Sequence, residues 1–147
     1  MSLAELTLIV YVATAWYLVG TVWFGQRIHF PLFQWVGADE FPGYIAAHYR
    51  SFGPVLWPAI ALNALALVVM LLGLRPEGVS LLMILVGLAL AIITGANTAA
   101  MVVPRLIRLG SDRDEATLRS LVRVHWIRTA SQSANGVLAL VMLAVSG

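Results

Sequence analysis

Residues 78–104 read GVSLLMILVGLALAIITGANTAAMVVP and contain no Asp, Glu, Lys or Arg. A helix that crosses the hydrocarbon core of a bilayer needs roughly 20 apolar residues, and this run is long enough to supply them. Three further uncharged runs lie at residues 6–26, 51–74 and 129–147. Four such runs predict a multi-pass membrane protein with an all-α fold, a four-helix transmembrane bundle.

The composition fits this fold class. Hydrophobic residues make up 61% of the chain and charged residues 11%, against about 25% charged residues in an ordinary soluble domain. Too little polar surface is left to coat a water-soluble globule. The absence of cysteine excludes disulfides, thiolate catalysis and iron–sulfur ligation. The chain has room for four spans and short connections, so we expect a single membrane domain over residues 1–147.

The expected helices are long. We place them at about residues 4–28, 40–73, 79–108 and 113–145. At about 1.5 Å per residue, the second and fourth exceed a hydrocarbon core of ~30 Å by several turns. Their surplus should extend or bend on the cytoplasmic side.

Local sequence signals refine these helices. Proline removes an amide donor and crowds the preceding turn, so Gly53-Pro54 and Trp57-Pro58 are the expected bend points of the second helix. Asp112, with Glu115 three residues later, is the expected N-cap of the fourth helix.

The arginines predict the orientation. Eight of the nine lie in or beside the connections at residues 27–50 and 105–128, and Arg75 alone lies at the opposite ends of the helices. The positive-inside rule therefore places those connections in the cytoplasm and both termini outside, in the cell (inner) membrane. Residues 1–6 carry no Lys or Arg, so the first run is expected to be a retained helix and not a signal peptide. Because the cations flank the spans, no nucleic acid partner is expected.

Polar residues converge toward the cytoplasmic side of this frame. His125, Arg128, Gln132 and Asn135 are spaced by 3, 4 and 3 residues, which places them on one face of the fourth helix. His29, His48 and His125 belong to three different helices and lie toward the same membrane face. Polar groups inside a membrane usually face a bundle interior or a wet cavity, so this convergence predicts a functional site.

Two readings stay open for the residues around that site. Asn97, Gln132 and Asn135 could bind a substrate, or they could serve as interhelical hydrogen-bonding groups worth about 1 kcal/mol each. Trp23, Trp57 and Trp126 could wall a flat hydrophobic ligand, or they could belong to an interfacial belt or to ordinary packing.

Three histidines also raise the question of a metal. His29, His48 and His125 could together ligate copper, zinc or iron, and two at matching depth could ligate haem. No local metal-binding spacing such as HxxxH or ExxH is present, and no carboxylate lies inside a span.

Several short motifs resemble the anthrone oxygenase-like family of small four-helix integral membrane proteins, many of whose bacterial members are uncharacterised. The similarity covers most of the chain. The motifs are Arg27-Ile28-His29-Phe30-Pro31-Leu32-Phe33, Glu40-Phe41-Pro42-Gly43-Tyr44 with His48, Val103-Pro104, and Leu121-Val122-Arg123-Val124-His125-Trp126-Ile127-Arg128-Thr129.

The resemblance implies a dioxygen-dependent oxidation, since family members in polyketide pathways convert an anthrone into an anthraquinone. It implies that His48, His125 and Arg128 are catalytic. A lipophilic, aromatic or phenolic substrate would enter from the bilayer, His48 or His125 would act as general base, and Arg128 would stabilise the resulting anion. The anion would then react with dioxygen, directly or at a bound metal.

Other functions stay open at this point. The protein could be a non-enzymatic subunit or scaffold of a larger membrane complex or homo-oligomer, in which the polar seam only holds four helices together. It could be a metal- or haem-binding redox protein. A carrier of anions or metabolites would use the arginines as an electrostatic funnel, and four helices would then require an oligomer.

Overall fold

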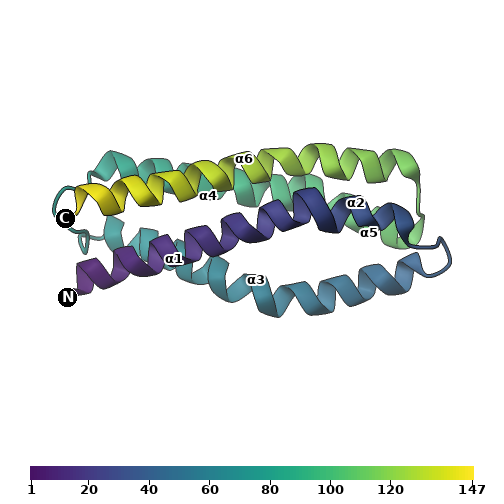
Figure 1. Ribbon diagram of the computed structural model, residues 1–147, viewed down its shortest axis with the longest axis horizontal. Coiled ribbons are helices and arrows are strands. Elements are labelled where there is room, and N and C mark those ends of the chain that lie inside the picture. The colour runs from purple at the N-terminus through teal and green to yellow at the C-terminus, as the bar shows by residue number, and fades with distance from the viewer.

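The computed structural model describes residues 1–147 as an all-helical bundle of four antiparallel helical stretches (Figure 1). The first consists of α1 (Leu3–Phe24), the π-helical turn η1 (Gly25–His29), α2 (Phe30–Leu32) and the 3-10 turn η2 (Phe33–Trp35). The second is α3 (Phe41–Leu71). The third consists of α4 (Leu81–Asn97), the π-helical turn η3 (Thr98–Val102) and α5 (Val103–Ser111), and the fourth is α6 (Glu115–Val145). Both termini lie at the same end of the bundle (Figure 1).

Three of the four stretches are long and apolar enough to cross a membrane: Leu3–Trp35, Phe41–Leu71 and Leu81–Ser111. The chain is therefore a helical membrane protein. The fourth stretch, α6, is equally long but carries more polar residues, and many of these are buried against the other helices. The buried polar residues of α6 are Thr117, His125, Thr129, Ser131, Gln132 and Asn135.

The helix boundaries differ from the expected ones mainly at the end of the bundle opposite the termini. There the first stretch continues to Trp35 instead of ending near residue 28, and the third continues to Ser111 instead of residue 108. Both stretches pass through a π-helical turn, which lets a helix continue around one extra residue. Pro54 and Pro58 lie inside α3, which stays helical across both.

Capping side chains set the starts of α1, α4 and α6. Ser2 and Glu5 form a capping box at α1, and Ser80 caps α4 through the backbone N–H of Met83. The expected N-cap of α6 at Asp112 is wrong, because α5 continues to Ser111 and leaves Asp112 extended. Asp114 caps α6 instead, accepting hydrogen bonds from both the backbone N–H and the hydroxyl of Thr117 at 2.7 and 2.5 Å. Thr117 supplies two donors, which no residue offers to Asp112.

The helices pack around the bundle in the order α3, α1, α6, then α4 with α5, which returns to α3. Apolar side chains form two separate clusters along the axis. One lies toward the termini and includes Tyr11, Leu67 and Met142. The other lies toward the opposite end and includes Phe33 and Leu121. The stretch of bundle between the two clusters is where the cavity described below is found.

Candidate functional site

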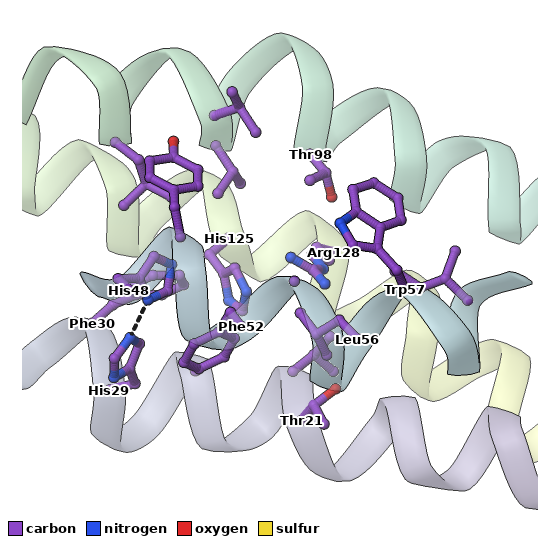
Figure 2. Close-up of a pocket in the computed structure, with 18 residues that line it drawn as sticks. Thr21, His29, Phe30, His48, Phe52, Leu56, Trp57, Thr98, His125 and Arg128 are labelled. Carbon is purple, nitrogen blue, oxygen red and sulfur yellow. Dashed lines mark hydrogen bonds between the residues drawn. The ribbon is translucent and has the colours of Figure 1, made fainter. Parts of the chain in front are cut away.

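A cavity of about 160 Å³ lies inside the bundle between the two apolar clusters. On α3, for example, its lining runs from His48 to Ile60, between Ile45 of one cluster and Ala66 of the other. All four helical stretches contribute to the wall, which is mostly apolar (Figure 2). The structure brings all three histidines and Arg128 to this one cavity.

Both π-helical turns of the chain lie at the cavity. Gly25 and His29 of η1 line it from one side, and Thr98 and Val102 of η3 line it from another. A π-helical turn shifts the direction of the side chains that follow it and is often found at functional sites. Here the two turns re-aim the ends of the first and third stretches toward the same interior space.

The side chain of Gln26 fixes the hydrogen-bonding state of His125. The amide nitrogen of Gln26 donates to the carbonyl oxygen of Val122 at 3.2 Å, which leaves the amide oxygen as an acceptor. That oxygen lies 2.9 Å from Nδ1 of His125, so Nδ1 must carry the proton. Nε2 of His125 is then an unprotonated nitrogen with no hydrogen-bond partner in the chain. A Cβ atom on Gly25 would lie only 3.5 Å from Nε2, so the glycine keeps the space before this nitrogen open.

Arg128, one turn along α6 from His125, is a cation without a counter-ion. None of the ion pairs of the protein involves it, and its Nε is buried with no hydrogen-bond partner. Taking a guanidinium out of water is costly unless an anion or several acceptors replace the water. Arg128 lines the cavity, so a bound anion could reach it.

His29 and His48 form a hydrogen-bonded pair at one end of the cavity, with His29 Nε2 2.9 Å from His48 Nδ1 (Figure 2). One imidazole donates and the other accepts, so the two rings share a proton. The ring of Phe52 lies 4.9 Å from that of His29 and 4.5 Å from that of His48. Phe30 bridges this pair to His125, its ring 4.8 Å from that imidazole. Aromatic rings therefore separate the histidine pair from His125.

Trp57 lies at the other end of the cavity, beside Thr98 (Figure 2). Its side chain lines the cavity although the residue is 67% exposed. The cavity therefore reaches the outer surface of the bundle at this residue. Of the three tryptophans predicted to wall a ligand, Trp57 alone lines the cavity.

Trp23 and Trp126 lie on the outer surface of α1 and α6. Their rings meet edge to face with centroids 5.7 Å apart, and the guanidinium of Arg27 lies 5.7 Å from the ring of Trp126. Trp23 also donates to the hydroxyl of Ser133 at 3.1 Å. The substrate-binding role predicted for both tryptophans is not supported by this placement, because each ring is engaged outside the cavity.

Asn97, Gln132 and Asn135 also lie outside the cavity lining and connect helices. Gln132 donates to the carbonyl oxygen of Ala15 at 3.3 Å, and Asn97 donates to that of Val124 at 3.2 Å. The side-chain oxygen of Asn135 accepts from the Tyr11 hydroxyl at 2.6 Å. These contacts favour the alternative reading of all three amides as interhelical hydrogen-bonding groups.

The predicted three-histidine metal site is not formed. No group of three or more His, Asp or Glu side chains is arranged to hold a metal ion. His29 and His48 each use one ring nitrogen for the hydrogen bond between them, and Nδ1 of His125 is hydrogen-bonded to Gln26. The physical reason is that the ring of Phe30 packs against His125 at 4.8 Å and against His29 at 5.6 Å, and so lies between His125 and the histidine pair.

Sequence reasoning missed Gln26, Gly25, Phe52 and Thr98 as members of this site. Gln26 is the most informative of them, because its amide sets the state of His125 from 99 positions away. A polar residue near the end of an apolar run is an available signal, but the partner that it selects depends on how the helices pack.

No protein-family model, no curated protein and no solved structure matches this chain. The resemblance to the anthrone oxygenase-like family therefore stays a prediction from its sequence motifs.

Proposed function

We propose that the protein is a membrane-embedded, oxygenase-like enzyme that oxidises a lipophilic phenol. One observation carries the proposal: a single apolar cavity holds a cation without a counter-ion, Arg128, and an unprotonated imidazole nitrogen one helical turn away, His125 Nε2. Such a pair is complementary to a weak acid. The imidazole accepts the proton, and the guanidinium stabilises the anion that forms.

In the membrane, we infer that α6 forms a fourth crossing. It is as long as α3 and packs between α1 and α4, and its buried polar side chains are screened from lipid by those helices. The half of the bundle opposite the termini carries every arginine except Arg75. By the positive-inside rule this end faces the cytoplasm, which puts both termini outside the inner membrane.

The first chemical step is a proton transfer. The aromatic ring of the ligand packs against Phe30 and Phe52, with its hydroxyl toward Arg128. His125 Nε2 removes the hydroxyl proton, and Gln26 supports the developing imidazolium through Nδ1–H. Arg128 stabilises the phenolate more strongly here than in water, because charge interactions strengthen where water is excluded.

Dioxygen then oxidises the electron-rich ring. A ring carbon ortho or para to the oxygen of the phenolate forms a bond to dioxygen, and protonation by His125 gives a hydroperoxide. Loss of the proton on that carbon and of hydroxide breaks the O–O bond and leaves a quinone and water. One oxygen atom becomes the new carbonyl and the other leaves as water. All the electrons come from the phenol, so no further reductant is needed, and an anthrone would follow the same balance.

The histidine pair has a separate place in this scheme. His29 and His48 lie at the far end of the cavity from Trp57 and share a proton. They donate to the oxygen that leaves as water and recover the proton that the ring carbon loses. This role needs both imidazoles, because either one alone lacks a partner that can replace the donated proton.

The test is oxygen uptake by the purified protein in lipid nanodiscs with anthrone, ortho-cresol and ortho-dodecylphenol, with quinone formation followed by absorbance. Oxidation of at least one substrate is expected, and loss of about a hundredfold or more in the variant Arg128→Ala, which removes the charge that stabilises the anion. Arg123→Ala is the matched control, because Arg123 is an exposed arginine on the same helix. Full activity in both Arg128→Ala and His125→Ala, or no oxidation of any of the three by the wild type, would overturn the proposal.

A further inference from the structure

We propose that the substrate of this site is a single-ring phenol with a long aliphatic tail, and that the tail leaves the bundle beside Trp57 and stays in the bilayer. This inference rests on the proposed function, which assigns the hydroxyl of the ring to His125 and Arg128. Beyond that function, we infer the size of the head group, the presence of a tail and the route by which the ligand enters.

The volume of the cavity matches a head group of one ring. An apolar cavity of roughly 150 Å³ binds one benzene molecule, and this cavity measures about 160 Å³. A fused three-ring molecule would require the walls to move. Any larger portion of the ligand must therefore lie outside the cavity.

The lining of the cavity extends along α3. Its lining on α3 includes His48, Phe52, Leu56 and Ile60, four residues apart on one face of the helix. At 1.5 Å per residue this stripe is about 18 Å long. A lining longer than one ring suits a ring whose attached alkyl chain follows this stripe out of the cavity better than it suits a compact molecule.

At Trp57 the cavity opens toward lipid. Trp57 lies near the middle of α3, inside a stretch long and apolar enough to span a membrane, and is 67% exposed while lining the cavity. Its neighbour Val55 is 53% exposed. At this depth the exposed surface of the bundle contacts acyl chains, so a tail that passes Trp57 remains in an apolar environment and loses no hydrophobic stabilisation.

Arg128 lies between His125 and Trp57 along the cavity (Figure 2). A tail attached ortho to a hydroxyl that Arg128 holds therefore begins near Trp57 and has a short path to the bilayer.

The wall beside Trp57 is the part of α3 that yields most easily. Pro54 and Pro58 each remove an amide donor from the helix there. Gly53 faces the Trp57 ring, with a position for Cβ 3.5 Å from it. Two missing hydrogen bonds and a missing side chain lower the cost of a bend that would widen the opening.

The experiment compares binding of ortho-cresol, ortho-dodecylphenol and an ortho-dodecylphenol with a bulky nitroxide at the end of its tail, to the protein in nanodiscs. Concentrations are expressed as mole fractions in the lipid, which removes the effect of partitioning. We expect the two tailed phenols to bind equally well, and both more tightly than ortho-cresol. Trp57→Ala should weaken both tailed phenols about fivefold, through the loss of aromatic contact with the tail, and leave ortho-cresol unchanged.

Trp35→Ala is the matched control, because Trp35 is also highly exposed but does not line the cavity. Exclusion of the nitroxide-tailed phenol, or tighter binding of ortho-cresol than of ortho-dodecylphenol, would overturn the inference that the substrate has a tail that leaves the bundle. The proposed function would stand in that case if ortho-cresol binding still depends on Arg128. If none of the three phenols binds, both the tailed substrate and the proposed function are rejected. An equal loss in both tryptophan variants would also reject the exit route.

Discussion

Nδ1 of His125 lies 2.9 Å from the side-chain oxygen of Gln26, and the nitrogen of the same amide donates to the carbonyl of Val122 at 3.2 Å. Because the amide nitrogen donates to Val122, the atom that faces His125 must be the amide oxygen, and Nδ1 of His125 must be the donor. If the amide were reversed, its oxygen would face the oxygen of Val122 and its N–H would face His125. The packing of η1 on α6 thus selects which nitrogen of His125 is free to accept a proton in the cavity.

The variant Gln26→Leu should therefore lower kcat about tenfold to hundredfold with little change in KM, because His125 loses the acceptor that holds its proton on Nδ1. Gln26→Glu retains an acceptor at the same place and should recover most of the activity. Nitrogen-15 NMR of His125 gives a readout that is independent of turnover. An unchanged tautomer in Gln26→Leu would show that Gln26 does not position the imidazole.

Gly25 offers a test of the space in front of His125. A methyl group at this position would lie 3.3 Å from Cε1 and 3.5 Å from Nε2 of the imidazole. Gly25→Ala should reduce phenol oxidation by at least about tenfold, because the ligand can no longer approach the nitrogen closely enough for proton transfer.

Gly20→Ala is the control for Gly25→Ala. Gly20 lies in α1, in the same helical stretch as Gly25, with nothing within 4 Å of its Cβ position, and the variant should retain full activity. Both substitutions replace glycine by a better helix former, so neither is expected to weaken α1 through helix propensity. Equal activity of the two variants would place the reacting ligand elsewhere in the cavity.

His29 and His48 should behave as one unit. His29→Phe and His48→Phe are each expected to slow oxidation about tenfold, and the double variant should be no slower than either single one, because removing one imidazole already ends proton sharing. The oxygen-uptake rates of the wild type, the two single variants and the double variant form a double-mutant cycle that tests this expectation. Independent, multiplying losses would mean that the two imidazoles act separately.

Asp114 makes the start of α6 sensitive to acid. Hydrogen bonds from the hydroxyl and the backbone N–H of Thr117 lower the pKa of Asp114 below the ordinary value of 3.8. A carboxylate with a lowered pKa stabilises the fold fully above the pKa of the unfolded chain, and this contribution is lost as the pH falls through the lower pKa of the folded protein.

The resistance of the wild type to unfolding in denaturing detergent, followed by circular dichroism, should therefore decrease as the pH falls below about 4. Asp114→Asn keeps a side-chain acceptor at the N-cap but has no proton to gain. It should lose the part of the pH dependence that comes from Asp114, and Asp112→Asn, at a position that caps no helix, should behave as the wild type. Identical pH profiles for all three proteins would contradict the assignment.

Local sequence rules succeeded where a single helix decides the outcome. Uncharged runs predicted four helical stretches, because an apolar run of that length has no other stable form in lipid. They failed at the α5–α6 connection, where Asp112, with Glu115 three residues later, carries the stronger local signal but Asp114 caps the helix. The choice between them depended on how far α5 continues after its π-helical turn and on the donors that Thr117 supplies.

The sequence by itself determined an all-helical membrane fold, the end of the bundle that gathers the arginines, and the helices that carry the histidines and Arg128. These follow from hydropathy, charge position and helical period, which are properties of segments. Only the tertiary structure decided that Trp57, and neither Trp23 nor Trp126, lines the cavity. It also decided that Gln132 and Asn135 join helices, and that Gln26 determines which ring nitrogen of His125 carries the proton. The rotation of each helix about its own axis makes those choices. That rotation is fixed by the packing of residues far apart in the chain, and no local pattern encodes it.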